Sequence, residues 1–244
     1  MYTETHRFYR YQHQAPRGWE SFQVRYRETD LWIRARRNLE REAAQAALSC
    51  RLQLEQYIAA HEDFLRSLAP LPDDPLAPPL VRRMLTAAAA AGVGPMASVA
   101  GAIAQAVGVA LKPFSDSVIV ENGGDCYLDM IGETTVGIFA GPESPFTGKI
   151  AVKLGAERFP IGICTSSGTV GHSLSFGKTD AVTVISPDAA LADAVATRLG
   201  NMVKTQADIN KALDLAPSIP SIEAVLILIK DKMGAWGNIE LVAI

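Results

Sequence analysis

Polar and apolar residues alternate near the start of the chain, as they do in strands with one buried face. Six apolar residues take every second position around the polar turn Glu28-Thr29-Asp30: Phe22, Val24, Tyr26, Leu31, Ile33 and Ala35. We therefore predict a hairpin over residues 22–36. Its other face carries four arginines: Arg25, Arg27, Arg34 and Arg36. These either meet the phosphates of a dinucleotide or lie solvated on an open face.

The apolar spacing then changes to the interval of a helix. Asn38 can cap a helix whose apolar residues include Leu48, Leu52, Tyr57, Ile58 and Leu65. His61 lies on this helix beside two acids, which favours a surface position. The proline-rich residues 69–79 predict an extended connector, and residues 80–91 predict a second helix.

Residues 84–111 contain no charged side chain, and the stretch is longer than a membrane span requires. Gly92, Gly94 and Pro95 interrupt it near the middle, however, and alanine is its commonest residue, 11 of 28. Alanine contributes little transfer energy and the interruption breaks a helix. We therefore predict two small-residue helices in a protein core, the second starting just after Pro95, and no membrane partner.

The remaining pattern is mostly of strands. Residues 116–121 and 127–131 predict a hairpin around Asn122-Gly123, a pair typical of a tight turn. Further strands are predicted at residues 136–140, 149–154 and 162–165, a short helix at 205–213, and a closing hairpin of 224–229 with 239–244. No Gly-x-Gly-x-x-Gly follows a strand, so the fold class is α+β rather than a dinucleotide-binding α/β sheet. A chain of 244 residues can bury a full core as a single domain, residues 1–244, with two interlocked halves.

Residues 182–200 join a buried strand to a helix. Ser186 supplies an N-cap, Pro187 a first-turn proline and Asp188 an acid near the positive helix end. One side of the helix is a core stripe: Leu191, Val195, Leu199 and Met202. The opposite side gathers small residues around one carboxylate and one hydroxyl: Ala189, Asp193, Ala196, Thr197 and Gly200. Small residues allow another group to approach this side closely.

Asp193 and Thr197 are four residues apart, so their oxygens project from one helix face. Two hard oxygen donors at this spacing suit Mg²⁺, which takes few protein ligands and leaves room for water and phosphate oxygens. Spacing alone also allows a different arrangement, in which Asp193 pairs with an arginine and Thr197 bonds to a carbonyl of its own helix.

The segment AVTVISPDAALADAVAT, residues 181–197, resembles the C-terminal motif of the ApbE-type FAD:protein FMN transferases. The resemblance implies that Asp193 and Thr197 bind the catalytic Mg²⁺. The segment GAIA, residues 101–104, is similar to the family's GAIAKG stretch, which implies that a main-chain carbonyl of Gly101 or Ala102 completes the metal site. Two charged residues of the family pattern are replaced here, an acid by Val99 and a lysine by Gln105.

Three further segments resemble flavin-binding parts of that family. Gly123, Gly124 and Asp125 match its GGD and imply a lining of the nucleotide pocket, alongside their role in the hairpin turn. Thr165, Ser166 and Gly168 fall in a loop similar to its TSG loop, where hydroxyls and bare amides can bind phosphate or ring oxygens. His172 stands in place of an HxxDPxTG-like loop whose Asp-Pro is missing, and it is a candidate acid or base.

The resemblance implies duplicated T-fold-like antiparallel sheets backed by helices. It also implies FAD and Mg²⁺ as ligands, with His172 and Asp193 as catalytic residues. A hydroxyl of an acceptor protein then attacks the phosphate joined to riboflavin, and AMP leaves. Because Val99, Gln105 and the missing Asp-Pro remove family features, a flavin or nucleotide binding protein without transferase activity is the alternative, and an assembly protein with an empty cleft is a third.

Composition bears on the possible partners, on disulfide or zinc sites, and on the cellular compartment. A net charge of −3 and a pI near 5.8 argue against a general nucleic-acid partner. Three widely spaced cysteines, Cys50, Cys126 and Cys164, favour neither a disulfide framework nor a zinc site. The opening residues lack the apolar region of an export signal, so we expect a cytoplasmic protein. Oligomeric state stays open.

Overall fold

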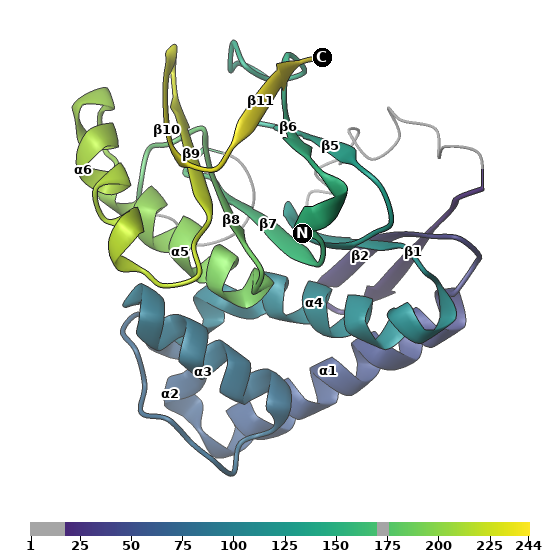
Figure 1. Ribbon diagram of the computed structural model, residues 1–244. Helices are drawn as coiled ribbons and strands as arrows, with labels where there is room; N and C mark the ends of the chain where they lie inside the picture. Colours follow the sequence, from purple (N-terminus) through teal and green to yellow (C-terminus); the bar gives the residue numbers. More distant parts are fainter. Residues whose placement is uncertain (1–17, 170–175) are drawn as a thin grey trace.

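Eight strands form one antiparallel sheet whose spatial order follows the chain, except that β5 and β6 leave it (Figure 1). The computed structural model describes residues 18–169 and 176–244. The strands of this large sheet, in spatial order, are β1 (Glu20–Tyr26), β2 (Thr29–Ala35), β3 (Val118–Asn122), β4 (Asp125–Asp129), β7 (Ile161–Ser166), β8 (Ala181–Ser186), β9 (Ala224–Ile229) and β10 (Lys232–Gly237). The three-stranded small sheet contains β11 (Glu240–Ala243), β6 (Ile150–Leu154) and β5 (Thr134–Gly137).

The large sheet repeats one order of elements. β1 and β2 form a hairpin, helices follow, and β3 and β4 form a second hairpin. The same order recurs in β7–β8, the helices after it, and β9–β10. The two repeats meet where β4 pairs with β7, with Cys126 opposite Ile163. The predicted α+β class and its duplicated antiparallel arrangement are confirmed.

The helices lie on one face of the large sheet and the small sheet lies on the other (Figure 1). The α-helices are α1 (Glu40–Ala60), α2 (Glu62–Arg66), α3 (Pro79–Ala91), α4 (Val99–Leu111), α5 (Ala189–Met202) and α6 (Ile209–Leu213). The 3-10 helices are η2 (Pro95–Ser98), η3 (Lys112–Phe114), η4 (Ala156–Arg158), η5 (Gln206–Asp208) and η6 (Ala216–Ser218). Strand β9 shows why two cores form. Val225 and Ile227 point to the helices, whereas Leu226 and Leu228 point to the small sheet.

The uncharged stretch forms two core helices, as the sequence predicts. Gly92, at φ +70°, ends α3, and Pro95 opens η2. Among the residues that the structure describes, Pro95–Phe114 is long and apolar enough to span a membrane. Its α4 part contacts α1 and α5 as well as β3 and β4, so its apolar face is used inside the fold.

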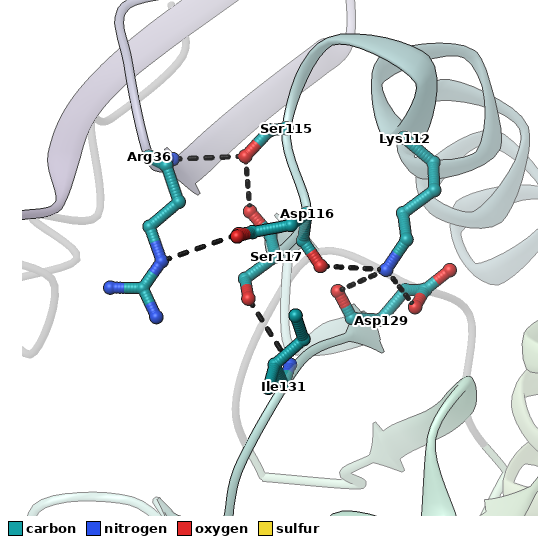
Figure 2. A network of polar contacts seen from close by, with 7 residues as sticks. All are labelled: Arg36, Lys112, Ser115, Asp116, Ser117, Asp129 and Ile131. Atoms are coloured by element: carbon teal, nitrogen blue, oxygen red, sulfur yellow. Dashed lines mark hydrogen bonds and ion pairs between the residues drawn. The ribbon is translucent and has the colours of Figure 1, made fainter.

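The C-terminal end of α4 is fixed by the polar network in Figure 2. Lys112 Nζ donates to the Asp116 carbonyl at 2.8 Å and also contacts the Asp129 carboxylate. Ser115 Oγ accepts from the Arg36 amide at 3.0 Å and donates to the Ser117 carbonyl at 2.6 Å. These bonds join the ends of β2, α4 and β4, and they hold the start of β3 in place.

The single helix predicted through Leu65 is divided, because α1 ends at Ala60 and α2 begins at Glu62. Leu48 and Leu52 are 39% and 45% exposed, while the inward positions are Ala43, Ala47, Cys50 and Leu54. Small side chains face inward because α1 packs against both β1 and α4. His61 is exposed, as predicted, and stacks on Tyr57.

The predicted closing hairpin is also wrong. β9 pairs with β10, which the sequence pattern missed, and β11 crosses to pair with β6. β10 is an edge strand of sequence KMGAWG, whose two glycines weaken the strand signal. Gly234 is needed there because a Cβ would lie 2.3 Å from Cγ2 of Ile209 on α6. In the first hairpin the turn is Arg27-Glu28, and Thr29 and Asp30 already belong to β2.

Candidate functional site

The start of α5 sets the geometry of the site. Asp188, rather than the predicted Ser186, is the N-cap, because its Oδ1 accepts from the amides of Ala190 and Leu191 at 2.9 and 3.2 Å. Ser186 is the last residue of β8, and its Oγ accepts from the Asp188 amide at 3.1 Å. The positive end of the helix dipole also stabilises a carboxylate at this position.

Ala189, the first residue of α5, is held from two sides. Its amide donates to Gln105 Oε1 on α4 at 2.9 Å, and its carbonyl accepts from Cys164 Sγ on β7 at 3.2 Å. Glycines allow this close approach. A Cβ on Gly101 would lie 2.2 Å from the Ala189 oxygen, and one on Gly162 would lie 2.5 Å from the Ala189 Cα. The first turn of α5 is therefore wedged between α4 and β7.

One turn further along α5, Asp193 reaches the start of α4. Its Oδ2 accepts from the Gly101 amide at 3.0 Å, and the Ala100 amide also donates to the carboxylate. Asn122 Nδ2 donates to the Ala100 carbonyl at 3.2 Å from the end of β3. Asp193 thus satisfies amides of the first turn of α4 that have no partner within their own helix.

Asp193 is a buried carboxylate, 9% exposed. Burial raises its pKa to about 7, although the hydrogen bonds from Gly101 and Ala100 lower it. In the part of the chain that the structure describes, none of the ion pairs involves Asp193, so the alternative of an arginine partner finds no support. A buried carboxylate without a cationic partner is costly to ionise, which is the physical basis of the raised pKa.

Asp125 forms a second buried acid beside the first. Its Oδ1 accepts from the Thr165 amide at 3.2 Å, and the Cys164 side chain lies near its carboxylate. Burial and then the charge of Asp193 raise the pKa of Asp125 well above its ordinary value. The hairpin turn next to it is Gly123-Gly124, both at positive φ, one residue later than the predicted pair Asn122-Gly123, which places Asn122 in β3. Gly124 also approaches the Thr165 carbonyl, at 3.6 Å from a hypothetical Cβ.

The loop after β7 runs beside the later part of α5. Ser166 Oγ and Thr179 Oγ1 lie 3.6 and 3.8 Å from the position of a Cβ on Gly200. The Gly168 amide donates to the Thr179 carbonyl at 2.9 Å. Ser166 therefore faces the small-residue side of α5, one turn beyond Thr197.

The structure brings most of the predicted site residues together. Asp193 accepts a hydrogen bond from Gly101, and Asp125 accepts one from Thr165. Ser166 lies beside α5 near Gly200. Thr197 is partly buried one turn after Asp193, and Ala102 is fully buried in α4. His172 lies outside the described residues. The assignment of all these residues to metal, flavin or catalysis stays a prediction.

Three residues that sequence reasoning did not assign to the site are Gln105, Asn122 and Cys164. Each makes a hydrogen bond between elements far apart in the chain, to Ala189 or Ala100. In the sequence, Gln105 stands out only as a replacement for a lysine, and Asn122 only as part of a turn. Their roles depend on which segments pack together, and no local pattern carries that information.

The donor chemistry at Asp193 fits Mg²⁺. Carboxylate and hydroxyl oxygens are its preferred ligands, and a buried acid with raised pKa would be stabilised in its charged form by a divalent cation. Among the described residues there is no group of three or more His, Cys, Asp or Glu that could hold a metal. The Gly101 group that bonds to Asp193 is its amide, whereas the predicted metal ligand is a carbonyl of Gly101 or Ala102.

Comparison with known proteins gives the family. The family model described as "AbpE bacteria" matches residues 12–219, which is most of the chain. The chain belongs to the ApbE family. A UPF0280 protein of Methanocaldococcus jannaschii is 39% identical over 227 residues, covering 91% of this chain and 92% of that protein.

Two solved ApbE structures share the fold. The apo flavinyl transferase ApbE of Pseudomonas stutzeri has a TM-score of 0.52 and 14% identity, and the match covers 89% of this chain and 94% of that chain. The ApbE protein of Thermotoga maritima has a TM-score of 0.52 and 15% identity, over 91% of this chain and 96% of that chain. The expected resemblance to the ApbE family is confirmed.

Proposed function

We propose that this ApbE-family protein binds FAD with Mg²⁺ and transfers FMN from it to a serine or threonine hydroxyl of a partner protein. The observation that carries the proposal is Asp193, a buried carboxylate with no cationic partner among the described ion pairs. It stands on the small-residue side of α5, one turn before Thr197. The solved ApbE structure of Pseudomonas stutzeri, from the same family, is described as a flavinyl transferase, which supports the same activity for this chain.

In this proposal each segment has one task. Asp193 and Thr197 hold the cation, and a carbonyl of Gly101 or Ala102 is the predicted third protein ligand. Gly123, Gly124 and Asp125 would bind the flavin nucleotide together with the adjoining residues 165–168, whose hydroxyls and amides can donate to phosphate or ring oxygens. We further propose that the protein works in the cytoplasm.

The reaction is a phosphoryl transfer. The hydroxyl oxygen of the acceptor forms a bond to the phosphorus joined to riboflavin, the bond between the two phosphates breaks, and AMP leaves with the bonding electrons. The hydroxyl proton passes to a base, for which His172 is the candidate, because Asp193 would hold the cation. Mg²⁺ would stabilise the charge that develops on the phosphate oxygens. The chain's own residues position the diphosphate and exclude water.

Substitution of Asp193 by alanine tests the proposal. We expect Asp193→Ala to remove the Mg²⁺ dependence of FAD binding while the protein stays folded. FAD titrations with and without Mg²⁺, followed by flavin fluorescence, measure this, and circular dichroism checks the fold. Glu143→Ala, which removes an exposed carboxylate, should retain the wild-type response. Equal FAD affinities with and without Mg²⁺ in the wild-type protein would count against the proposal.

A second candidate is a protein that binds the flavin nucleotide without transferring it. Gln105 favours it: this side chain replaces a lysine of the family pattern and is used to hold the Ala189 amide. A neutral amide committed to a helix terminus cannot supply the charge of a lysine to the nucleotide. Release of AMP from FAD in the presence of an acceptor peptide separates the two, because only the transferase produces AMP.

A further inference from the structure

Thr179 carries a buried hydroxyl that has no hydrogen-bond partner. The residue is 0% exposed, and among the residues that the structure describes only Gln53 also has a buried side-chain oxygen without a partner. An unsatisfied buried hydroxyl is costly, and native structures keep few of them. Valine has the same branched shape without the hydroxyl, so packing alone would favour valine at this position. A ligand or a water molecule is the partner that the Thr179 oxygen lacks.

The backbone on both sides of Thr179 is fixed, so a shift of the chain does not readily give its hydroxyl a partner. The Lys178 amide donates to the Val203 carbonyl, just after α5, at 3.0 Å. The Asp180 amide donates to the Leu228 carbonyl on β9 at 2.9 Å. These two bonds hold Thr179 between the end of α5 and the large sheet.

The Thr179 hydroxyl lies beside the small-residue side of α5, at Gly200. A Cβ placed on Gly200 would lie 3.8 Å from Thr179 Oγ1 and 3.6 Å from Ser166 Oγ. Val182 Cγ2 lies 3.8 Å from the same position, and Ser166 pairs with Val182 across β7 and β8. All three are ordinary contact distances, so one heavy atom fits here beside both hydroxyls. We call this space the Gly200 notch.

The Gly200 notch is on the same helix side as the proposed cation site but is separate from it. Gly200 lies two helical turns after Asp193, about 10 Å along the helix axis. Ser166 and Thr197 are partly buried, whereas Thr179 and Gly200 are buried. The accessible side of the notch is therefore at Ser166 and Thr197, and Thr179 lies at its bottom.

The side chains around the Gly200 notch are uncharged, which decides what can bind there. The two hydroxyls can each donate a hydrogen bond, and the rest of the lining is the Val182 methyl group and the α5 backbone. None of the three nearest side chains would neutralise a phosphate oxygen, and burial of an unpaired charge is costly. A neutral acceptor, such as a carbonyl oxygen, would satisfy the Thr179 hydroxyl without that cost.

We propose that Thr179 Oγ1, together with Ser166 Oγ, donates a hydrogen bond to a carbonyl oxygen of the flavin ring, which enters the Gly200 notch. This rests on the proposed function, because the ligand is the same FAD. It makes Thr179 a positioning residue for the ring, a task that the sequence pattern did not assign to it. The cation near Asp193 and the notch at Gly200 would then hold two different parts of one ligand.

Thr179→Val tests the inference through two measurements of opposite sign. We expect the affinity for FAD, with Mg²⁺ present, to fall about tenfold, as loss of one hydrogen bond to a ligand does. The Tm of the ligand-free protein should rise by about 2–4 °C, because a buried unsatisfied hydroxyl is removed. Flavin fluorescence titration and thermal unfolding measure the two. Thr134→Val, in β5 of the small sheet, should leave the FAD affinity unchanged.

Two further variants and a second ligand locate the effect. Thr179→Ser keeps the hydroxyl and should keep most of the affinity for FAD. Gly200→Ala fills the notch with a methyl group, so it should weaken FAD binding at least about tenfold while the Tm rises through helix propensity. ADP lacks the flavin ring, and it should bind Thr179→Val as it binds the wild-type protein.

The failures of the two proposals are distinguishable. A wild-type FAD affinity in Thr179→Val, with the Mg²⁺ dependence intact, would mean that water alone occupies the notch, which overturns the inference and leaves the proposed function standing. Equal losses of FAD and ADP affinity would place the effect away from the ring and also overturn it. So would a lower Tm in Thr179→Val, which would reveal a structural partner for the hydroxyl. A wild-type protein that does not bind FAD overturns both proposals.

Discussion

The Asp193 carboxylate accepts a hydrogen bond from the Gly101 amide at 3.0 Å, across 92 residues of the chain. The bond joins the middle of α5 to the start of α4, and both helices lie on the same face of the large sheet. It explains why α4 and α5 pack so closely at this point. It also ties the charge state of Asp193 to the stability of the fold.

Stability without divalent cations should fall as pH rises towards neutrality. The pKa of Asp193 is about 7 in the folded protein, against an ordinary value of 3.8. Between these values the folded state keeps a proton that the unfolded state has lost, so the free energy of unfolding decreases as pH increases. For one proton, the decrease is about 2 kcal/mol from pH 5 to pH 7. Urea unfolding at several pH values, with chelator present, measures it.

Asp193→Asn is the matched variant for this pH dependence. Asparagine has a similar shape and can still accept from the Gly101 amide, but it does not titrate. The variant should therefore lose the part of the decrease that Asp193 contributes and keep the part that comes from Asp125, whose pKa is also raised by burial, whereas Glu143→Gln should retain the whole decrease. Mg²⁺ should stabilise the wild-type protein most at pH 8, where Asp193 is ionised. A wild-type stability that rises between pH 5 and pH 7 would contradict this account.

Two helical glycines should respond in opposite ways to alanine. A Cβ on Gly101 would lie 2.2 Å from the Ala189 oxygen, so Gly101→Ala must push α5 away and should cost about 3 kcal/mol. A Cβ on Gly200 has its nearest neighbour at 3.6 Å, an ordinary contact. Gly200→Ala should then stabilise by about 0.5–1 kcal/mol through helix propensity. Urea unfolding compares them, and equal effects would refute the close approach of α4 and α5.

Much of the secondary structure could be predicted because local chemistry decides it. The run Ala224–Ile229 is apolar at every position and forms β9 with the predicted bounds. Gly92 and Pro95 mark the break between α3 and η2, where the sequence placed it. β10 could not be found this way, since an exposed edge strand with glycines lacks the apolar pattern. The buried face of α1 was missed because alanines, rather than leucines, face inward.

The candidate site was only partly predictable for a different reason. Asp193 and Gly101 were both singled out, and family resemblance brought the two segments together. Spacing within one helix says nothing about the partner that its carboxylate meets. The bond from the Gly101 amide to Asp193, and the bond from the Thr165 amide to Asp125, depend on how β4, β7 and the two helices pack. That packing is set by the whole sheet.

Gln105 should be a positioning residue for α5. Its Oε1 is the partner of the Ala189 amide, the first of the helix. Gln105→Ala should cost about 1 kcal/mol, as loss of a helix-terminal acceptor does. Gln105→Glu keeps an acceptor and should preserve stability, whereas Gln105→Lys faces the amide with another donor and should cost at least as much as alanine. Urea unfolding of the three variants tests this order, and a Gln105→Lys variant as stable as wild type would refute it.

The network of Figure 2 should contribute to stability chiefly through Ser115. Its Oγ lies in a buried residue, accepts from the Arg36 amide and donates to the Ser117 carbonyl. Ser115→Ala leaves both backbone groups without this partner and should cost about 1–3 kcal/mol. Ser218→Ala is the control, because its hydroxyl donates to the Leu215 carbonyl at an exposed site where water can replace it. Similar urea midpoints for both variants would show that burial of this network adds nothing.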